Sequence, residues 1–388
     1  MAPIQYKMNV VLLALEWGTK SDAELSIFYR ELSKQLAKLS GVQVSVLLPH
    51  YDQEEKNEAL NHNITLVEPT ERHGFDDETH YLCFPPENLK MDFVIGHGVQ
   101  LGSQAEYIRE KRNCKWIQFV HNDPEEEGMY KGQANAISKG EREHQDEVNL
   151  CAKADLVVAV GPKLAEAYRS YLRFWRKDVF VLTPGIFNDF SNIGQSKLDG
   201  RKRRVLVFGN VDIEDFCLKG IDIAAKAVAK LNDAYLIVIG TAKQDEVAGR
   251  LKEYDIPPSR LRIRSLTEIS VKQLMSEVDL AIMPSRTEGF GLVALEAMSA
   301  GLPVLVSANS GFGEVMKEDS FGSSYVIDSQ DAEVWARKIE KVWAEGGEAE
   351  ALRNNYAEKY NWEQQCRDLV EKMRGILNGK KYSGSVPL

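Results

Sequence analysis

The segment at residues 284–298 places two carboxylates, Glu288 and Glu296, on either side of seven residues. An apolar run precedes the segment and a helical pattern follows it, which predicts a buried strand, a tight loop and a helix. The backbone N–H groups and the dipole of such a helix start favour an anion. Gly289 and Gly291 would let the backbone approach that anion closely. Both acids are expected to reach one ligand cavity. The alternative is a plain strand–helix connection with two solvated acids.

Polar residues and glycines also follow other apolar runs, which is where loops that carry function are expected. Gly18 lies in the loop after the first run, and His97 stands between two glycines after a later one. His121 ends the run at 116–120, and Lys219 precedes a glycine. The lysine and the histidines also have a structural interpretation, in which the lysine lies on the surface and the histidines are core or capping residues. The remaining histidines show no metal-ligand spacing, so no metal site is predicted.

Apolar, β-rich runs alternate with helical patterns along the chain and must position these residues. Strands are predicted at 10–15, 42–48, 93–95, 116–120, 156–160, 179–182, 205–208, 236–239, 261–263, 280–283, 304–306 and 324–327. Continuous apolar strands that alternate with helices predict parallel sheets covered on both faces. The fold class is therefore α/β.

A polar stretch at 192–204 divides the strands into two series and predicts a linker between two doubly wound, Rossmann-like domains. We expect an N-terminal domain at residues 1–195 and a C-terminal domain at 204–360. A helical pattern at 350–377 is long enough to cross back, and residues 361–380 are expected to reach the first domain. Ligands of open parallel sheets bind beyond the carboxyl ends of the strands, so the two domains would face each other across a cleft.

Composition excludes several classes of protein. The chain has 388 residues, of which 44% are hydrophobic and 27% charged, as in ordinary globular proteins. A formal charge of −10 argues against a general binder of nucleic acid or anionic membranes. Five cysteines without CxxC spacing indicate reduced thiols and a cytoplasmic location. No apolar run is long enough to span a bilayer, and the oligomeric state cannot be predicted.

The ordered set of motifs resembles the family 4 retaining glycosyltransferases of the GT-B architecture over nearly the whole chain. The specific part is the Glu-x7-Glu motif with EGFGL at 288–292, followed by AGLPV at 300–304. ADLVVAV at 154–160 and Lys219-Gly220 are supporting matches. The resemblance implies a nucleotide-sugar donor in the cleft, an acceptor of unknown identity on the side of the first domain, and no metal or cofactor.

The resemblance also implies residue roles. Glu288 would contact hydroxyls of the donor sugar, Glu296 the ribose hydroxyls and Lys219 the diphosphate, while His121 would face one of the sugars. The implied catalytic residues are Lys219, Glu288 and His121, and the implied donor-binding residues are Asn210, Glu288, Gly289, Phe290, Gly291, Leu292 and Glu296. The leaving phosphate would help to deprotonate the acceptor.

Two departures from the family pattern affect the phosphate side. The first-domain loop, which includes Gly18, has Ala23-Glu24 where the family usually has adjacent glycines. Asn210 stands where the family usually has an arginine paired with the equivalent of Lys219. Loss of an electrostatic stabiliser of this kind can cost roughly a hundredfold in rate. The alternative function is therefore a catalytically impaired member that acts as a nucleotide-sugar sensor or scaffold.

Two charged groups near these motifs are left open. Glu125-Glu-Glu127 is expected to be a solvated loop rather than an acceptor site. Arg286 could pair with phosphate or be exposed to solvent.

Overall fold

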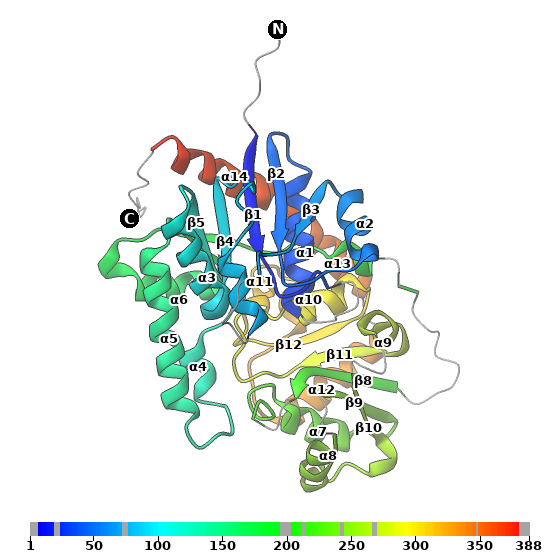
Figure 1. The fold of residues 1–388 in the computed structure, drawn as a ribbon. Coiled ribbons are helices and arrows are strands. Elements are labelled where there is room, and N and C mark those ends of the chain that lie inside the picture. The colour runs from blue at the N-terminus through cyan, green and yellow to red at the C-terminus, as the bar shows by residue number, and fades with distance from the viewer. Residues whose placement is uncertain are drawn as a thin grey trace.

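Two parallel β-sheets, each covered by helices, make up the chain (Figure 1). The computed structural model describes residues 7–18, 24–71, 77–191, 193–194, 203–211, 214–240, 244–265, 270–346 and 348–379. We call the first sheet with its helices the N-terminal half, and the second sheet with its helices the C-terminal half. The predicted parallel α/β architecture is confirmed.

The N-terminal half is built on a seven-stranded parallel sheet in the order β3-β2-β1-β4-β5-β6-β7. Its strands are β1 (Met8–Leu13), β2 (Val42–Leu47), β3 (Ile64–Val67), β4 (Phe93–His97), β5 (Lys115–Val120), β6 (Leu156–Val160) and β7 (Val179–Leu182). Its helices are α1 (Glu24–Ala37), α2 (Gln53–Asn61), α3 (Gly98–Lys111), α4 (Pro124–Gly128), α5 (Ala136–Lys153) and α6 (Pro162–Tyr171).

The C-terminal half is built on a six-stranded parallel sheet in the order β10-β9-β8-β11-β12-β13. Its strands are β8 (Arg203–Val211), β9 (Ala234–Gly240), β10 (Leu261–Ser265), β11 (Leu280–Met283), β12 (Val304–Ser307) and β13 (Val326–Ile327). The helices from here to the end of the chain are α7 (Ile221–Lys230), α8 (Gln244–Leu251), α9 (Val271–Glu277), α10 (Leu292–Ser299), α11 (Gly311–Lys317), α12 (Ala332–Ala344), α13 (Ala349–Lys359) and α14 (Trp362–Leu377).

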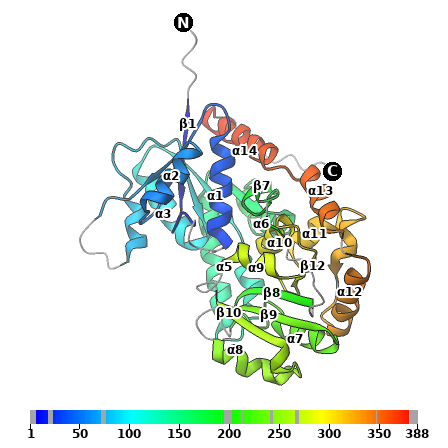
Figure 2. The ribbon, with the colours of Figure 1, turned by 90° about the vertical axis from the view of Figure 1, so that its right-hand side faces the viewer.

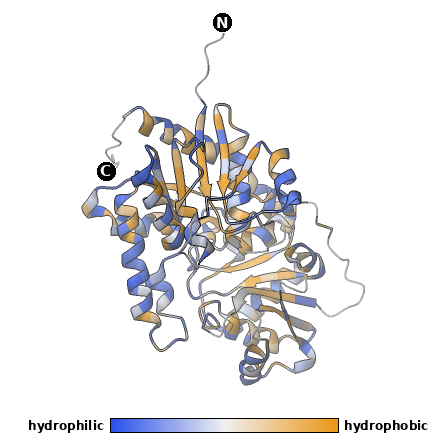
Figure 3. Cartoon of the chain, viewed as in Figure 1, coloured by the Kyte–Doolittle hydropathy of each residue, from blue (hydrophilic) through white to orange (hydrophobic). Residues whose placement is uncertain are grey.

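The strands carry the apolar residues, and the outward faces of many helices are polar (Figure 3). On the first sheet, alternate strand residues such as Val10 and Val11 enter two different clusters of buried apolar side chains. One cluster includes Phe28 and Leu32 of α1, and the other includes Leu101 and Ala105 of α3. Both faces of the sheet are therefore buried, which explains why its strands are continuous apolar runs.

The last helix of the chain lies beside the first one. Figure 2 shows α12 and α13 leading from the C-terminal half up to α14, which packs against α1 and β7. Trp362 at the start of α14 contacts the ring of Phe28 in α1. Gln365 accepts a hydrogen bond from the backbone N–H of Thr183, just after β7, at 3.0 Å. The end of the chain thus completes the packing of its N-terminal half.

Three details differ from the expected elements. The short edge strand β3 was not predicted, because four residues give too little alternation to stand out. The strand expected at 324–327 contains only Val326 and Ile327, since a 3₁₀ turn occupies Gly322–Tyr325. The helical pattern at 350–377 is two helices, because Asn361 caps the second by accepting from the N–H groups of Glu363 and Gln364. The predicted linker at 192–204 lies largely outside the described residues.

Candidate active site

Glu288 stands in the loop between β11 and α10, and its backbone is tied to a neighbouring loop. The N–H of Glu288 donates to the carbonyl oxygen of Asn309 at 3.1 Å, and Glu288 forms an isolated parallel bridge with Ser310. The side chain points into a mostly buried place, with the whole residue 8% exposed. The local sequence therefore holds a carboxylate at the carboxyl end of a buried strand, as predicted.

The carboxylate of Glu288 forms an ion pair with Lys219, which is 69 positions earlier in the chain. The Nζ of Lys219 lies 3.0 Å from Oε1 and 2.8 Å from Oε2 of Glu288. The hydroxyl of Ser285 also donates to Oε2, at 3.2 Å. Both charged side chains are largely buried. A buried ion pair loses its hydration, and hydrogen bonds such as these offset that cost. The structure thus brings together two of the residues that the sequence singled out.

The turn that carries Lys219 is fixed against the Glu288 loop. Gly220 has a φ of +66°, and a Cβ on it would overlap the carbonyl oxygen of Pro284. Only glycine fits such a position without strain. Arg286 donates to both carboxylate oxygens of Asp222, at 2.8 and 2.9 Å, and also to the carbonyl oxygen of Cys217. This hydrogen bonding raises the pKa of Arg286. Arg286 therefore joins two loops and is not the solvent-exposed side chain of one alternative, whereas its pairing with phosphate stays a prediction.

Gly289 brings the Glu288 loop against the N-terminal half. A Cβ at Gly289 would overlap the carbonyl oxygen of His121, which follows β5. The next residue, Phe290, is buried and lies so close to Gly161 after β6 that a Cβ there would meet its ring. Gly291 has a φ of +99° and directly precedes α10 as its N-cap. Gly289 therefore lets the loop pack against the backbone of the N-terminal half, while the close approach of this loop to an anion stays a prediction.

His121 and His97 lie side by side because β5 and β4 are neighbours in register, with His97 opposite Phe119. The Nδ1 of His97 is 3.1 Å from the Nε2 of His121. Desolvation by burial lowers the pKa of His121 to about 3 and that of His97 well below its ordinary value. Both rings are therefore neutral near pH 7, and one of the two facing nitrogens donates a hydrogen bond to the other.

Aromatic side chains surround this histidine pair. The ring of Tyr29 lies over His97, with centroids 3.8 Å apart, and Phe28 meets His121 edge-on at 5.1 Å. The Nε2 of His97 and the Nδ1 of His121 are buried without a hydrogen-bond partner among the described residues. A neutral pair with unpaired outer nitrogens can exchange a hydrogen bond with a polar ligand, but it is poorly suited to carry a positive charge.

Glu127 is less exposed than the sequence suggested. The residues expected to form a solvated loop begin α4, and the side chain of Glu127 is only 13% exposed. Its carboxylate accepts from Asn122 at 3.4 Å and pairs with Lys131 at 3.5 Å. Desolvation raises its pKa, and the charges of Lys219 and Glu288 also act on it. Glu127 therefore lies within electrostatic range of the Lys219–Glu288 pair, although it belongs to the N-terminal half.

Glu296 lies in the second turn of α10 and is 1% exposed. Leu292 is the first residue of that helix and is also buried. A carboxylate at this depth is costly unless polar groups or a ligand accompany it, so its burial is consistent with a binding role but does not identify one.

The phosphate-side residues are described only in part. Gly18 has a φ of +79°, and its carbonyl oxygen accepts from Arg30 of α1, which also pairs with Asp189 at 2.8 Å. Ala23 lies outside the described residues, and Glu24 and Asn210 are described only as backbone positions in α1 and β8.

Lys163 was missed by the sequence analysis. It lies in the first turn of α6, after Gly161 and Pro162, and its ammonium reaches across to the Glu288 loop. Its Nζ is 2.6 Å from the hydroxyl oxygen of Thr287, 3.4 Å from the carbonyl oxygen of Glu288 and 3.3 Å from that of Asn309. A lysine after a strand is common, and no local signal marks one that crosses between halves.

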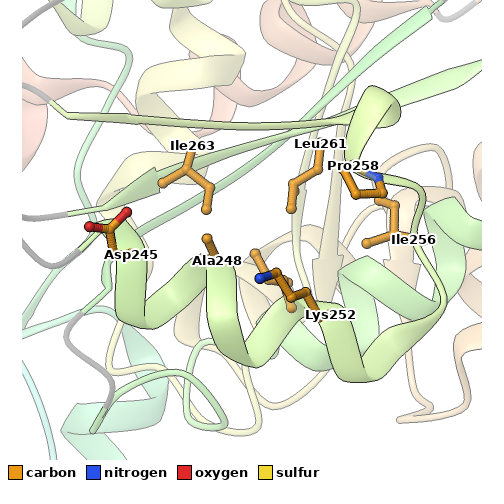
Figure 4. Close-up of a pocket in the computed structure, with 8 residues that line it drawn as sticks. Asp245, Ala248, Lys252, Ile256, Pro258, Leu261 and Ile263 are labelled. Carbon is orange, nitrogen blue, oxygen red and sulfur yellow. The ribbon is translucent and has the colours of Figure 1, made fainter.

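Other features do not add to this site. Among the described residues, no group of three or more His, Cys, Asp and Glu side chains is arranged to hold a metal. None of the described helices has the length and apolar character needed to cross a membrane. A cavity of about 270 Å³ lies between α8 and the edge strand β10 (Figure 4). Its walls are mainly apolar, including Ala248, Leu261 and Ile263, and it contains none of the predicted site residues.

Comparison with known protein families gives one match that spans most of the chain. Residues 11–369 match the family described as "Family 4 Glycosyltransferase in conflict systems". A relative from Methanocaldococcus jannaschii, described as an uncharacterized glycosyltransferase, is 22% identical over 94% of this chain and 97% of its own length. The D-inositol 3-phosphate glycosyltransferase of Corynebacterium urealyticum is 24% identical over 92% of both chains.

Solved structures share the fold at low sequence identity. Sucrose-phosphate synthase from Thermosynechococcus elongatus has a TM-score of 0.72 and 19% identity, over 96% of this chain and all of that one. Anabaena HepE, solved in complex with UDP and glucose, has a TM-score of 0.66 and 14% identity, over 95% of this chain and all of that one. The two-sheet arrangement is thus the GT-B fold.

Proposed function

The chain belongs to the family 4 glycosyltransferases in conflict systems, and from that membership we propose that it transfers a sugar from a nucleotide-sugar donor to an acceptor. We further propose that the anomeric configuration is retained. In this reaction the bond between the anomeric carbon and the diphosphate breaks, and its electron pair leaves with the diphosphate. The acceptor oxygen bonds to the anomeric carbon on the same face, and its proton passes to the departing phosphate.

The observation that carries this proposal is the Lys219–Glu288 ion pair where the two halves meet. A lysine ammonium is a mobile point charge that suits a diphosphate, and a carboxylate suits sugar hydroxyls. Both oxygens of Glu288 lie within 3.0 Å of Nζ of Lys219. Donor binding would place the diphosphate against the ammonium and the sugar hydroxyls against the carboxylate. Charge that develops on the leaving group would then meet a cation already in position.

Two further residues fit roles in the same proposal. Glu296, buried in α10, would accept hydrogen bonds from the ribose hydroxyls, since a carboxylate can accept from a vicinal diol. His121, kept neutral by its buried surroundings, would offer a hydrogen bond to a sugar rather than act as a charged acid. Loop segment 289–292 would supply backbone amides near the phosphate.

The test is donor turnover and binding with a panel of UDP-, GDP- and ADP-sugars. Because HepE has been solved with UDP and glucose, UDP-glucose is the first donor to try. We expect donor hydrolysis or transfer with at least one member, and a loss of about a hundredfold or more in Glu288→Gln. Circular dichroism of the variant checks that it folds.

Calorimetry separates the outcomes. Binding of a nucleotide sugar without any turnover would replace the enzyme proposal with the sensor or scaffold alternative. Absence of binding to every donor would remove both. If Glu296→Ala leaves the affinity for the bare nucleotide unchanged, the ribose site has been misplaced.

A further inference from the structure

Lys163 is a nearly buried cation that the proposed chemistry does not use. Its side chain is 13% exposed, although it belongs to the N-terminal half and most of its oxygen partners belong to the C-terminal half. Within its own half it pairs with Glu126, whose Oε2 is 3.0 Å away. A buried ammonium has three N–H donors to satisfy. The ammonium of Lys163 lies within reach of a carboxylate, a hydroxyl and two carbonyl oxygens. Because these oxygens come from both halves, its charge has all of its hydrogen-bond partners only when the two halves are in contact.

The partners of Lys163 are the groups that shape the Glu288 loop. The carbonyl oxygen of Asn309 accepts from Lys163 Nζ and also from the N–H of Glu288. The side-chain amide of Asn309 donates to the carbonyl oxygen of Arg286 at 2.7 Å and to Glu126 at 3.1 Å. Lys163 thus holds Thr287 and the backbone of Glu288 while Lys219 holds the carboxylate of Glu288. We call Glu126, Lys163, Thr287 and Asn309 the cross-half latch.

We propose that Lys163 is a positioning residue that sets the orientation of Glu288 from the opposite half. The position of Glu288 relative to the donor sugar then depends on the contacts of the cross-half latch. This inference rests on the proposed function for Glu288. Removing the ammonium leaves the carbonyl oxygens of Glu288 and Asn309 without this donor and frees the loop to shift. An error of about 1 Å in such a group can cost roughly a hundredfold in rate.

The first experiment needs no donor. Hydrogen exchange of the Glu288 amide is measured in the wild type, Lys163→Met and Lys153→Met. Lys153 is the matched control, because it is an exposed lysine of the same half that pairs with Glu106 at 2.7 Å. We expect Lys163→Met to speed exchange of that amide about tenfold or more, and Lys153→Met to leave it unchanged. Equal exchange in wild type and Lys163→Met would overturn the proposal.

The second experiment uses the donor that the wild type turns over. Lys163→Met should lower kcat/KM for the nucleotide sugar about tenfold or more while the affinity for bare nucleotide stays within about twofold. Lys163→Arg should recover part of the loss, since its guanidinium keeps the charge and several donors. Equal weakening for sugar nucleotide and bare nucleotide would contradict a specific effect on Glu288. A wild type without any donor would defeat the proposed function, and the exchange experiment would still decide the role of Lys163.

A double-mutant cycle tests the contact itself. Thr287→Val removes the hydroxyl that lies 2.6 Å from Lys163 Nζ and keeps the shape of the side chain. If the two residues act together, the effects of Lys163→Met and Thr287→Val on the exchange rate will be clearly less than additive. Fully additive effects would show that the contact does not carry the coupling.

Discussion

Lys219 and Glu288 hold opposite charges against each other in a largely buried place, and the proposed reaction requires both. Lys219→Met should lower kcat/KM for the donor by about a hundredfold or more, because the leaving diphosphate loses its cation. Steady-state kinetics measures this, with Lys230→Met as the control. Lys230 is half-exposed at the end of α7 and pairs with Glu333 at 2.9 Å, away from the site. Normal turnover in Lys219→Met would remove this lysine from the mechanism.

Gly289 is a residue at which the backbones of the two halves pack closely together. Gly289→Ala should prevent the Glu288 loop from seating on His121, because the new Cβ would overlap its carbonyl oxygen. We expect a larger radius of gyration by small-angle scattering and a loss of donor turnover. Gly249→Ala is the control, since a Cβ at Gly249 in α8 meets nothing within 4 Å. An unchanged scattering profile with full activity in Gly289→Ala would show that the loop adapts without cost.

The residue pairs also show what a sequence can reveal about the site. Glu288 was predicted from its place in a glycine-rich loop after an apolar run, and Lys219 from its place in the ordered set of family motifs. His97 and His121 could have been paired, since they end neighbouring strands. The contacts of Lys163 and Arg286 could not have been predicted, because they depend on how two loops or the two halves approach each other. The position of a residue along its own helix or loop does not indicate its distance from residues of another loop or of the other half.

Among the elements, α5 carries a carboxyl group whose burial has a measurable consequence. Glu147 is 1% exposed, and desolvation raises its pKa from 4.5 to about 8, while a hydrogen bond from Tyr168 opposes the shift. The folded protein therefore holds this proton more tightly than the unfolded chain does. Its contribution to stability is complete below pH 4.5 and is lost as the pH rises towards about 8.

Glu147→Gln should therefore be more stable than the wild type at pH 8, and the difference should shrink as the pH falls towards 4.5. Thermal unfolding across this range measures it. Glu141→Gln is the control, at an exposed position in the same helix. His121 has the opposite effect, since its lowered pKa removes stability as the pH falls from 6.5 towards 3, so the comparison must be made between variants. Parallel curves for Glu147→Gln and wild type would refute this account.

The elements were predicted where their patterns were long. Eleven of the strand predictions coincide largely with observed strands, but β3 was missed and the strand at 324–327 proved to be mostly a 3₁₀ turn. Such short edge elements depend on their neighbours more than on their own residues. The break between α13 and α14 depends on one capping asparagine, which periodicity alone does not reveal.

At the scale of the molecule, α14 joins the end of the chain to its beginning. Trp362 is 5% exposed and lies against Phe28 of α1 and Phe187 after β7. Trp362→Ala should lower the free energy of unfolding by about 3–5 kcal/mol, since a large buried ring is replaced by a cavity. Urea denaturation measures it, and Trp175→Ala, at a position 48% exposed, should change stability little. Equal midpoints for the two variants would mean that α14 contributes no packing energy.

The contact between α14 and α1 also bears on how the chain folds during its synthesis. Cys366 and Leu369 of α14 belong to the same buried cluster as Phe28 and Leu32 of α1. While the ribosome is still making the second sheet, that apolar face of α1 has no final cover. The N-terminal half is therefore synthesised first, but its packing is completed only when α14 has been made. A fragment that ends before α14 will expose this apolar face of α1, which favours aggregation or chaperone binding.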